Sequence, residues 1–195
     1  REIRAGVYPE GVMPVQDFFN KKNADIGIQI INPVKKETVA MNLINTKHSF
    51  YNLSKSGRIQ TEFELLKDIK YRIFFNCNDD NVLQELIERI KEKRFHFTPY
   101  LGLAQFTASI DFVDKTKATH IVNDQNEFVL INTAVNLSKV KDTEPVEFDN
   151  IGMYAANNMP VEMDKNREVQ EYSEVLIENN GKPIKVKAKQ ILQIF

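Results

Sequence analysis

The sequence predicts an α+β fold, and three features of the chain indicate it. Two segments, 25–31 and 71–75, alternate apolar and polar residues, as half-buried strands do. An amphipathic pattern typical of a helix follows at 81–93. The chain after residue 116 is mostly β-like. We therefore expect a mixed unit over residues 1–116 and a small β-rich domain over 117–195.

The composition is that of a globular protein with a hydrophobic core. Of 195 residues, 42% are hydrophobic and 27% are charged, and the formal net charge is −1. The charge is uneven: residues 32–61 hold five basic residues and one acidic residue, whereas 118–180 hold twelve acidic and four basic residues. This asymmetry indicates two surfaces with different partners, and it argues against a wholly basic nucleic-acid binder.

The single cysteine, Cys77, excludes an internal disulfide and a zinc site with several cysteines. Because it follows the apolar strand at 71–75, we expect a buried, inert thiol. No apolar run approaches the roughly 20 residues of a membrane-spanning helix, so no membrane contact is expected. No signal peptide is visible, so the expected location is cytoplasmic.

The first part of the chain holds a strand and a long polar insertion. Residues 1–24 have little periodicity, and we expect a loop with a short helix near 15–21. The strand at 25–31 ends at an Asn-Pro turn. Residues 34–67 are too long and polar for a simple loop. We expect them to form an extended β-hairpin whose tip lies near 49–57.

A strand, a helix and a further strand follow. Lys70–Asn76 alternates as a strand, and Asp79 or Asp80 is placed to cap the helix at 81–93. After a turn at 98–102, residues 105–114 alternate again and predict another strand. Strand, helix and strand would make a βαβ unit. With the strand at 25–31, this accounts for most of a βαββαβ, ferredoxin-like core of the RNA-recognition-motif type.

The β-rich part has two predicted features. Residues 127–134 form a strand candidate. The clearest hairpin is expected at 172–191, where two alternating segments flank Asn180 and Gly181, the preferred pair for a two-residue hairpin turn.

Residue sets for catalysis or metal binding are scarce. No two histidines have the spacing of a metal-binding helix, and no nucleophile elbow or phosphate loop occurs. We therefore expect no metal and no cofactor. One group, Lys47, His48 and Tyr51, could cleave RNA without metal, with a base deprotonating the 2′-OH and a cation stabilising the phosphorane. The alternative is that these side chains only contact phosphate or face solvent.

The 34–67 segment carries the candidate RNA-binding residues. The amides of Asn42 and Asn45 can hydrogen-bond base edges, and Lys47 can neutralise a phosphate. Arg58 and Gln60 on the return strand could face the same ligand. Aromatic residues nearby suit single-stranded RNA, whose bases stack on rings. The alternative is a polar strand with a solvated face, and composition does not decide between the two.

Tyr100 and Gly102 are further candidates, in the turn before the 105–114 segment. Tyrosine can stack on a base, and glycine lets a backbone approach a ligand closely. The alternative is a plain tight turn, and for Gly102 this is the favoured interpretation.

Four segments in order resemble the Cas-five family of CRISPR-associated proteins, in the RAMP superfamily, in its type I-B form. The resemblance covers roughly residues 25–115 and is carried by Asn42–Lys47, Arg58–Leu66, Tyr71–Ile73 and Thr98–Gly102.

The resemblance implies a ferredoxin-like core, a protruding β-hairpin thumb at about 34–67 and a small C-terminal β domain. It implies a non-catalytic subunit of the crRNA-guided surveillance complex, Cascade. Such a subunit binds the 5′ handle of the crRNA, caps the backbone of Cas-seven subunits and contacts the large Cas-eight subunit. Target DNA near the PAM end is a further partner left open. In one related subtype, I-C, the protein also cuts precursor crRNA, so a metal-independent endoribonuclease is the alternative function.

Two features depart from that family. Its members begin with a strand and helix that build the first half of the core, and no such pattern precedes Asp25, so this first βα unit is missing or diverged. The Gly-rich turn of the family is reduced here to Tyr100-Leu101-Gly102.

Overall fold

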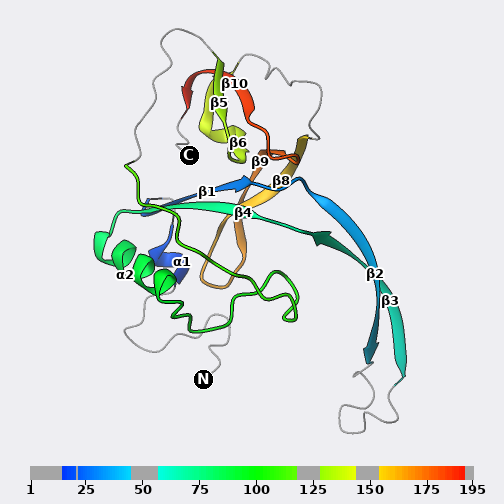
Figure 1. Ribbon diagram of the computed structural model, residues 1–195. Coiled ribbons are helices and arrows are strands. Elements are labelled where there is room, and N and C mark those ends of the chain that lie inside the picture. Colours follow the sequence, from blue (N-terminus) through cyan, green and yellow to red (C-terminus); the bar gives the residue numbers. More distant parts are fainter. Residues whose placement is uncertain (1–14, 21, 45–56, 118–127, 144–153, 192–195) are drawn as a thin grey trace.

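The computed structural model describes residues 15–20, 22–44, 57–117, 128–143 and 154–191 (Figure 1). The fold is α+β, dominated by strands. In chain order its elements are α1 (Val15–Phe18), β1 (Ala24–Ile30), β2 (Lys35–Ile44), β3 (Arg58–Lys67), β4 (Tyr71–Cys77), α2 (Asp80–Lys91), β5 (Phe128–Ile131), β6 (Val135–Asn136), the 3-10 turn η1 (Leu137–Lys139), β7 (Val140–Thr143), β8 (Tyr154–Met163), β9 (Val169–Glu178) and β10 (Ile184–Ile191). None of the helices in these ranges is long and apolar enough to cross a membrane.

Two antiparallel strand pairs organise the N-terminal half. β1 pairs with β4, with Ile28 opposite Ile73. β2 pairs with β3 over ten residue pairs, from Lys35 opposite Lys67 to Ile44 opposite Arg58. The chain thus leaves β1, runs out along β2 and returns along β3 into β4. The pairing of β2 with β3 confirms the two strands of the hairpin predicted over 34–67, and Figure 1 shows these strands extending away from the other elements. Residues 49–56 of the predicted tip lie outside the described residues.

Helix α2 confirms the prediction of a capped amphipathic helix. The carboxylate of Asp79 accepts hydrogen bonds from the backbone N–H groups of Asn81 at 2.9 Å and Val82 at 3.3 Å. These bonds satisfy amides that have no partner within the helix. Ile87 is buried on the apolar side. Cys77, at the end of β4, is also buried, as predicted.

The strand predicted at 105–114 is wrong, and the βαβ unit is not formed. Apart from one isolated bridge between Tyr100 and Thr107, this segment has no strand pairing among the described residues. A strand is stable only when a neighbour accepts its backbone hydrogen bonds, and alternation alone does not supply that neighbour. The segment is instead attached to the end of α2, where Lys93 donates to the carbonyl of Ile110 at 2.5 Å and pairs with Asp111.

The main core lies in the C-terminal half. Two three-stranded sheets, β5-β10-β7 and β6-β9-β8, contribute to one apolar cluster. Its buried members are Ile131, Val135, Leu176 and Ile184. β5 ends at Ile131, before the end of the strand predicted at 127–134. Beyond it, the backbone N–H of Ala134 donates to the carbonyl of Ile28 in β1, at 2.8 Å.

The hairpin predicted at 172–191 is also wrong, since β9 and β10 belong to different sheets. The side chain of Glu178 explains this outcome. Its Oε2 accepts hydrogen bonds from the N–H groups of Asn180 at 2.9 Å and Lys182 at 2.5 Å. The N–H of Lys182, which would close a two-residue hairpin by bonding to Asn179, is therefore used by Glu178, and the two strands separate.

This turn packs against the base of the long hairpin. The N–H of Val34 donates to the carbonyl of Asn179 at 2.8 Å. Gly181 has φ +77°, and a Cβ atom there would lie 2.9 Å from the carbonyl oxygen of Ile31. The close approach fixes the C-terminal half next to the point where β1 leads into β2, so the hairpin extends from a supported base.

Candidate nucleic-acid interface

The register of β2 and β3 gives the hairpin two different faces. Side chains of odd-numbered residues share one face, which is largely apolar along its length, and those of even-numbered residues share the other. The apolar side chains are Val39, Met41, Leu43, Ile59, Phe63 and Leu65. We use the name polar face for the surface formed by Thr38, Asn42, Arg58, Gln60, Glu62 and Glu64.

Three of the predicted site residues meet at the outer end of the polar face. Asn42 lies directly opposite Gln60. Arg58 lies opposite Ile44, the next residue of β2 on the same face as Asn42. Directly opposite residues in a β-pair have Cβ atoms about 4.5–5.5 Å apart, so these side chains are within reach of a single ligand. All three are exposed, and within the described part of the chain none makes a hydrogen bond or ion pair. The structure therefore brings Asn42, Arg58 and Gln60 together as predicted.

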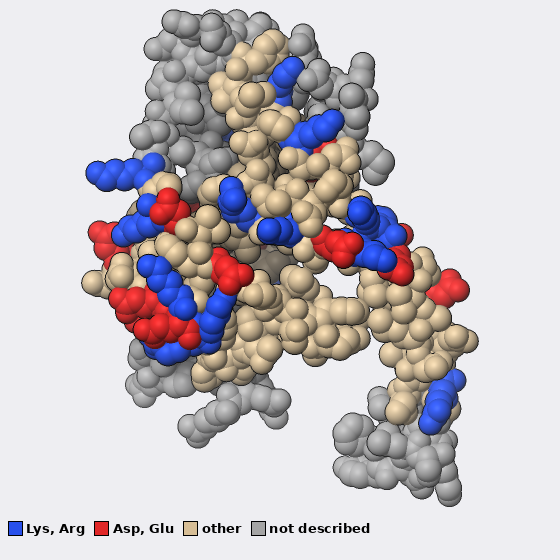
Figure 2. All heavy atoms as spheres, viewed as in Figure 1, with Lys and Arg blue, Asp and Glu red and all other residues tan. Residues whose placement is uncertain are grey.

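The base of the hairpin is different, because two of its three lysines are paired with acidic residues. Lys36 contacts Glu64 at 2.7 Å, and Lys67 contacts Glu37 at 3.0 Å. The hydrogen bond to Glu37 also raises the pKa of Lys67 above its ordinary value of 10.5. Figure 2 shows mixed red and blue atoms at the base of the hairpin, and blue atoms without red ones at the outer end of its described part. At that outer end Arg58 therefore offers an anion a positive charge that is not paired with an acidic side chain among the described residues.

Glu62 is a further residue of this face, and the sequence prediction of binding residues did not include it. It lies on the same face as Gln60, opposite Ala40, and it is exposed. Its carboxylate repels phosphate and limits the anion-binding part of the face to the positions beyond Gln60. Residues two apart on a strand share a face, so the sequence alone predicts that Glu62 lies on the same face as Arg58 and Gln60.

Two further predicted residues, Asn45 and Lys47, lie outside the described residues. The same is true of His48 and Tyr51, which complete the alternative group for RNA cleavage.

Tyr100 and Gly102 lie in a separate tight loop. The N–H of Leu101 donates to the carbonyl of Phe106 at 2.8 Å, and that of Ala108 donates to Pro99 at 2.8 Å. Gly102 has φ +79°, a conformation that glycine adopts without strain. The Tyr100 side chain is 56% exposed. No hydrogen bond or ring contact between described residues joins this loop to β2 or β3.

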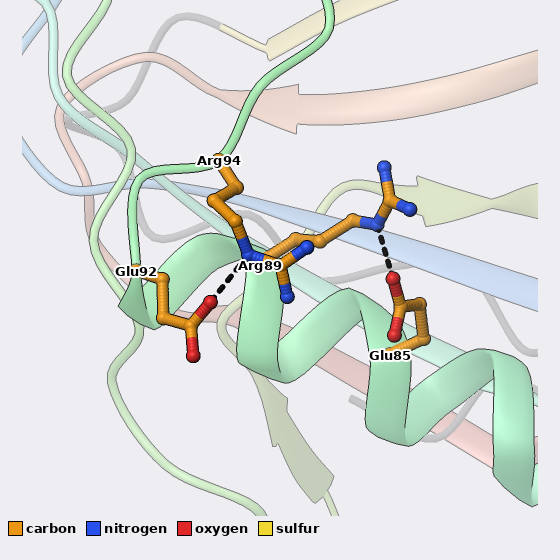
Figure 3. Close-up of polar contacts among 4 residues, drawn as sticks. All are labelled: Glu85, Arg89, Glu92 and Arg94. Atoms are coloured by element: carbon orange, nitrogen blue, oxygen red, sulfur yellow. Dashed lines mark hydrogen bonds and ion pairs between the residues drawn. The ribbon is translucent and has the colours of Figure 1, made fainter.

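Arg89 in α2 and Arg94, just after its end, are less suited to anion binding than Arg58, because they are already paired. Figure 3 shows Arg89 directed at Glu85, at 2.5 Å, and Arg94 directed at Glu92. The hydrogen bond from Arg89 lowers the pKa of Glu85 below its ordinary value of 4.5. The bond to Glu92 likewise raises the pKa of Arg94. Figure 2 shows the resulting mixture of charges over α2.

In the ranges that the structure describes, no cluster of three or more His, Cys, Asp or Glu residues could hold a metal ion. A scan against protein-family models finds no match to the sequence, and a search of curated proteins finds no significant relative.

Proposed function

We propose that this chain is a structural RNA-binding subunit that holds single-stranded RNA with the outer end of its β2–β3 hairpin. On the resemblance to the Cas-five family, the ligand is the repeat-derived 5′ handle of a crRNA. The protein is then a non-catalytic subunit of a type I CRISPR surveillance complex, Cascade, acting in antiviral defence in the cytoplasm.

The observation that carries this proposal is the group formed by Asn42, Arg58 and Gln60 on the polar face. Its three side chains are exposed and have no partner among the described residues. Two amides offer donors and acceptors to the edges of unpaired bases, and a guanidinium can bind phosphate in a bidentate manner. A hairpin that extends from a fixed base can reach an RNA strand lying alongside the protein.

The fold supports the same proposal. In a ferredoxin-like core, the antiparallel β1–β4 pair and α2 would correspond to two of the strands and one of the helices. In this interpretation the β2–β3 hairpin is the thumb, and Lys47 and Asn45 would extend the RNA contact beyond Asn42. Tyr100 and Gly102 would contact a separate part of the handle. The remaining surfaces would dock the Cas-seven backbone and the Cas-eight subunit.

The proposal is tested by mixing the purified protein with a labelled CRISPR repeat RNA, with and without EDTA. A gel shift reports binding, and a denaturing gel reports cleavage. We expect a shifted and intact RNA in both conditions, with a weaker shift for a fully double-stranded RNA of equal length. Specific cleavage in EDTA would assign the chain as a metal-independent ribonuclease using Lys47, His48 and Tyr51. An absence of binding at low salt would contradict the proposal and indicate a protein-interaction module.

A further inference from the structure

The outer edge of β4 carries a second inference, which does not depend on RNA binding. We propose that this edge is a binding site for an extended segment of a partner polypeptide, which adds to the β1–β4 sheet as a third strand.

The hydrogen-bond pattern defines which backbone groups face that edge. The N–H of Ile31 donates to the carbonyl of Lys70, and the N–H of Asn78 donates to that of Asn23, both at 2.9 Å. In an antiparallel ladder the directions alternate from one residue to the next. Residues 72, 74 and 76 therefore bond to β1, whereas the N–H and C=O groups of residues 71, 73 and 75 point away from β1.

These outward groups have no partner within the described residues, where β4 pairs with β1 alone. The outer edge of β1 is different, because Ile28 accepts from Ala134 and Asp25 contacts Lys139 at 3.4 Å. The C-terminal half thus covers one edge of the sheet, and the other edge has no strand partner among the described residues. An open edge is a template for an added strand, which gains affinity from main-chain hydrogen bonds.

One face of the same sheet is apolar and exposed. Ile73 is 66% exposed and its partner Ile28 is 46% exposed, and Ile26, one pair further along, is 61% exposed. Phe75 shares the face and has an edge-to-face contact with Phe19 in the region after α1. A two-stranded sheet is marginal by itself, and a third strand would bring side chains that cover Ile73. The apolar surface therefore adjoins the open backbone edge.

The chemistry of the partner segment follows from the two faces of β4. On the side of Ile73, the segment needs apolar side chains at alternate positions. On the opposite side Arg72 is exposed and makes no ion pair with the described residues, so an acidic side chain beside it is favoured. Because β4 has seven residues, a segment of about that length fills the edge.

The test uses a seven-residue peptide that alternates valine and threonine, with glutamate at the centre of the threonine side. Amide hydrogen exchange is followed by NMR with and without millimolar peptide. We expect exchange at the outward amides of Ile73 and Phe75 to slow about tenfold or more. The amides of Arg72 and Phe74 should change little, because they already bond to β1. A peptide with lysine in place of glutamate should protect less.

Two variants separate strand addition from nonspecific binding. Ile73→Pro removes an outward N–H that β1 does not use, so the β1–β4 ladder should persist while peptide protection is lost. Ile73→Val keeps the N–H and should retain the protection.

Three outcomes would overturn the proposal. One is unchanged exchange at Ile73 and Phe75 with peptide. Another is slow exchange at these amides in the dilute protein alone, which would mean that the edge is already covered. The third is protection that grows with protein concentration without peptide, which would identify a second copy of the chain as the occupant.

Discussion

Asn42 and Gln60 lie directly opposite each other on the polar face of the β2–β3 hairpin. Each amide offers both a donor and an acceptor, and both side chains are exposed. Arg58 shares this face beyond Gln60, so a guanidinium that can bind a phosphate lies next to amides that can hydrogen-bond bases. This pairing of two functions within a few residues is what the proposed function requires.

Replacing both amides should reduce the preference for the correct RNA. The double variant Asn42→Ala with Gln60→Ala should lose about 1 kcal/mol per amide in binding a repeat RNA. Binding of a scrambled RNA of equal composition should change less, because its affinity depends mainly on phosphate contacts. The control is Thr61→Ala, which lies on the same strand but on the other face. Equal losses for both RNAs would contradict a role in base recognition.

Gly102 and Gly181, the two described glycines with positive φ, should respond differently to alanine. At Gly181 the new Cβ would meet backbone oxygen, with Ile31 O at 2.9 Å, whereas at Gly102 nothing lies within 4 Å. The left-handed backbone alone costs alanine about 1–2 kcal/mol, so Gly102→Ala should lose about this much free energy of unfolding. Gly181→Ala should lose clearly more, because the turn must also move off β1. Urea unfolding of the two variants compares them, and equal losses would contradict the close contact.

The C-terminal core should dominate stability. Ile184 is 1% exposed within the cluster shared by the two sheets. Ile184→Ala should cost about 2–5 kcal/mol in free energy of unfolding, as expected for a buried large-to-small change. Ile73→Ala, at a 66% exposed position in β4, should cost about 0.5 kcal/mol or less. Similar costs at both positions would show that β4 is covered in solution.

The contact between α2 and the 105–114 segment should weaken in acid. The hydrogen bond from Lys93, together with its charge, lowers the pKa of Asp111 below its ordinary value of 3.8. Because the pKa of Asp111 is lowered in the folded state, the contact contributes its full stabilisation above pH 3.8. This stabilisation is lost as the pH falls through the pKa of the folded state. NMR titration of the Asp111 carboxyl should show this, and Lys93→Met should return the pKa towards 3.8. An unchanged pKa of Asp111 in that variant would contradict the ion pair between Lys93 and Asp111.

Local patterns predicted the elements whose stability is local. The cap at Asp79 and the apolar stripe of α2 lie within one turn or one helix, and β2 and β3 are consecutive strands that pair with each other. The segment 105–114 failed because a strand needs a neighbour that the pattern does not name. The hairpin at Asn180-Gly181 failed because the side chain of Glu178 binds the turn amides. The carbonyl of Asn179, the other group that would close the hairpin, accepts from the N–H of Val34, far away in the sequence.

Like the fold, the candidate site was only partly predictable from the sequence. The residue types at 42, 58 and 60 indicated an RNA-binding surface, and alternation put 58 and 60 on one face. Placing Asn42 opposite Gln60 required the register of β2 and β3, which the alternation within each strand does not define. Tyr100 and Gly102 are local turn residues, and their sequence did not show how they lie relative to the hairpin.

The most direct test of the central claim is the salt dependence of binding a single-stranded repeat RNA by the wild type and by Arg58→Ala. If Arg58 binds a phosphate, the variant should bind more weakly, and the slope of log K against log salt should be shallower by about 0.7. Arg89→Ala, which removes an arginine already paired with Glu85, should leave both quantities near the wild-type values. An affinity and slope unchanged in Arg58→Ala would contradict RNA binding by the outer end of the hairpin.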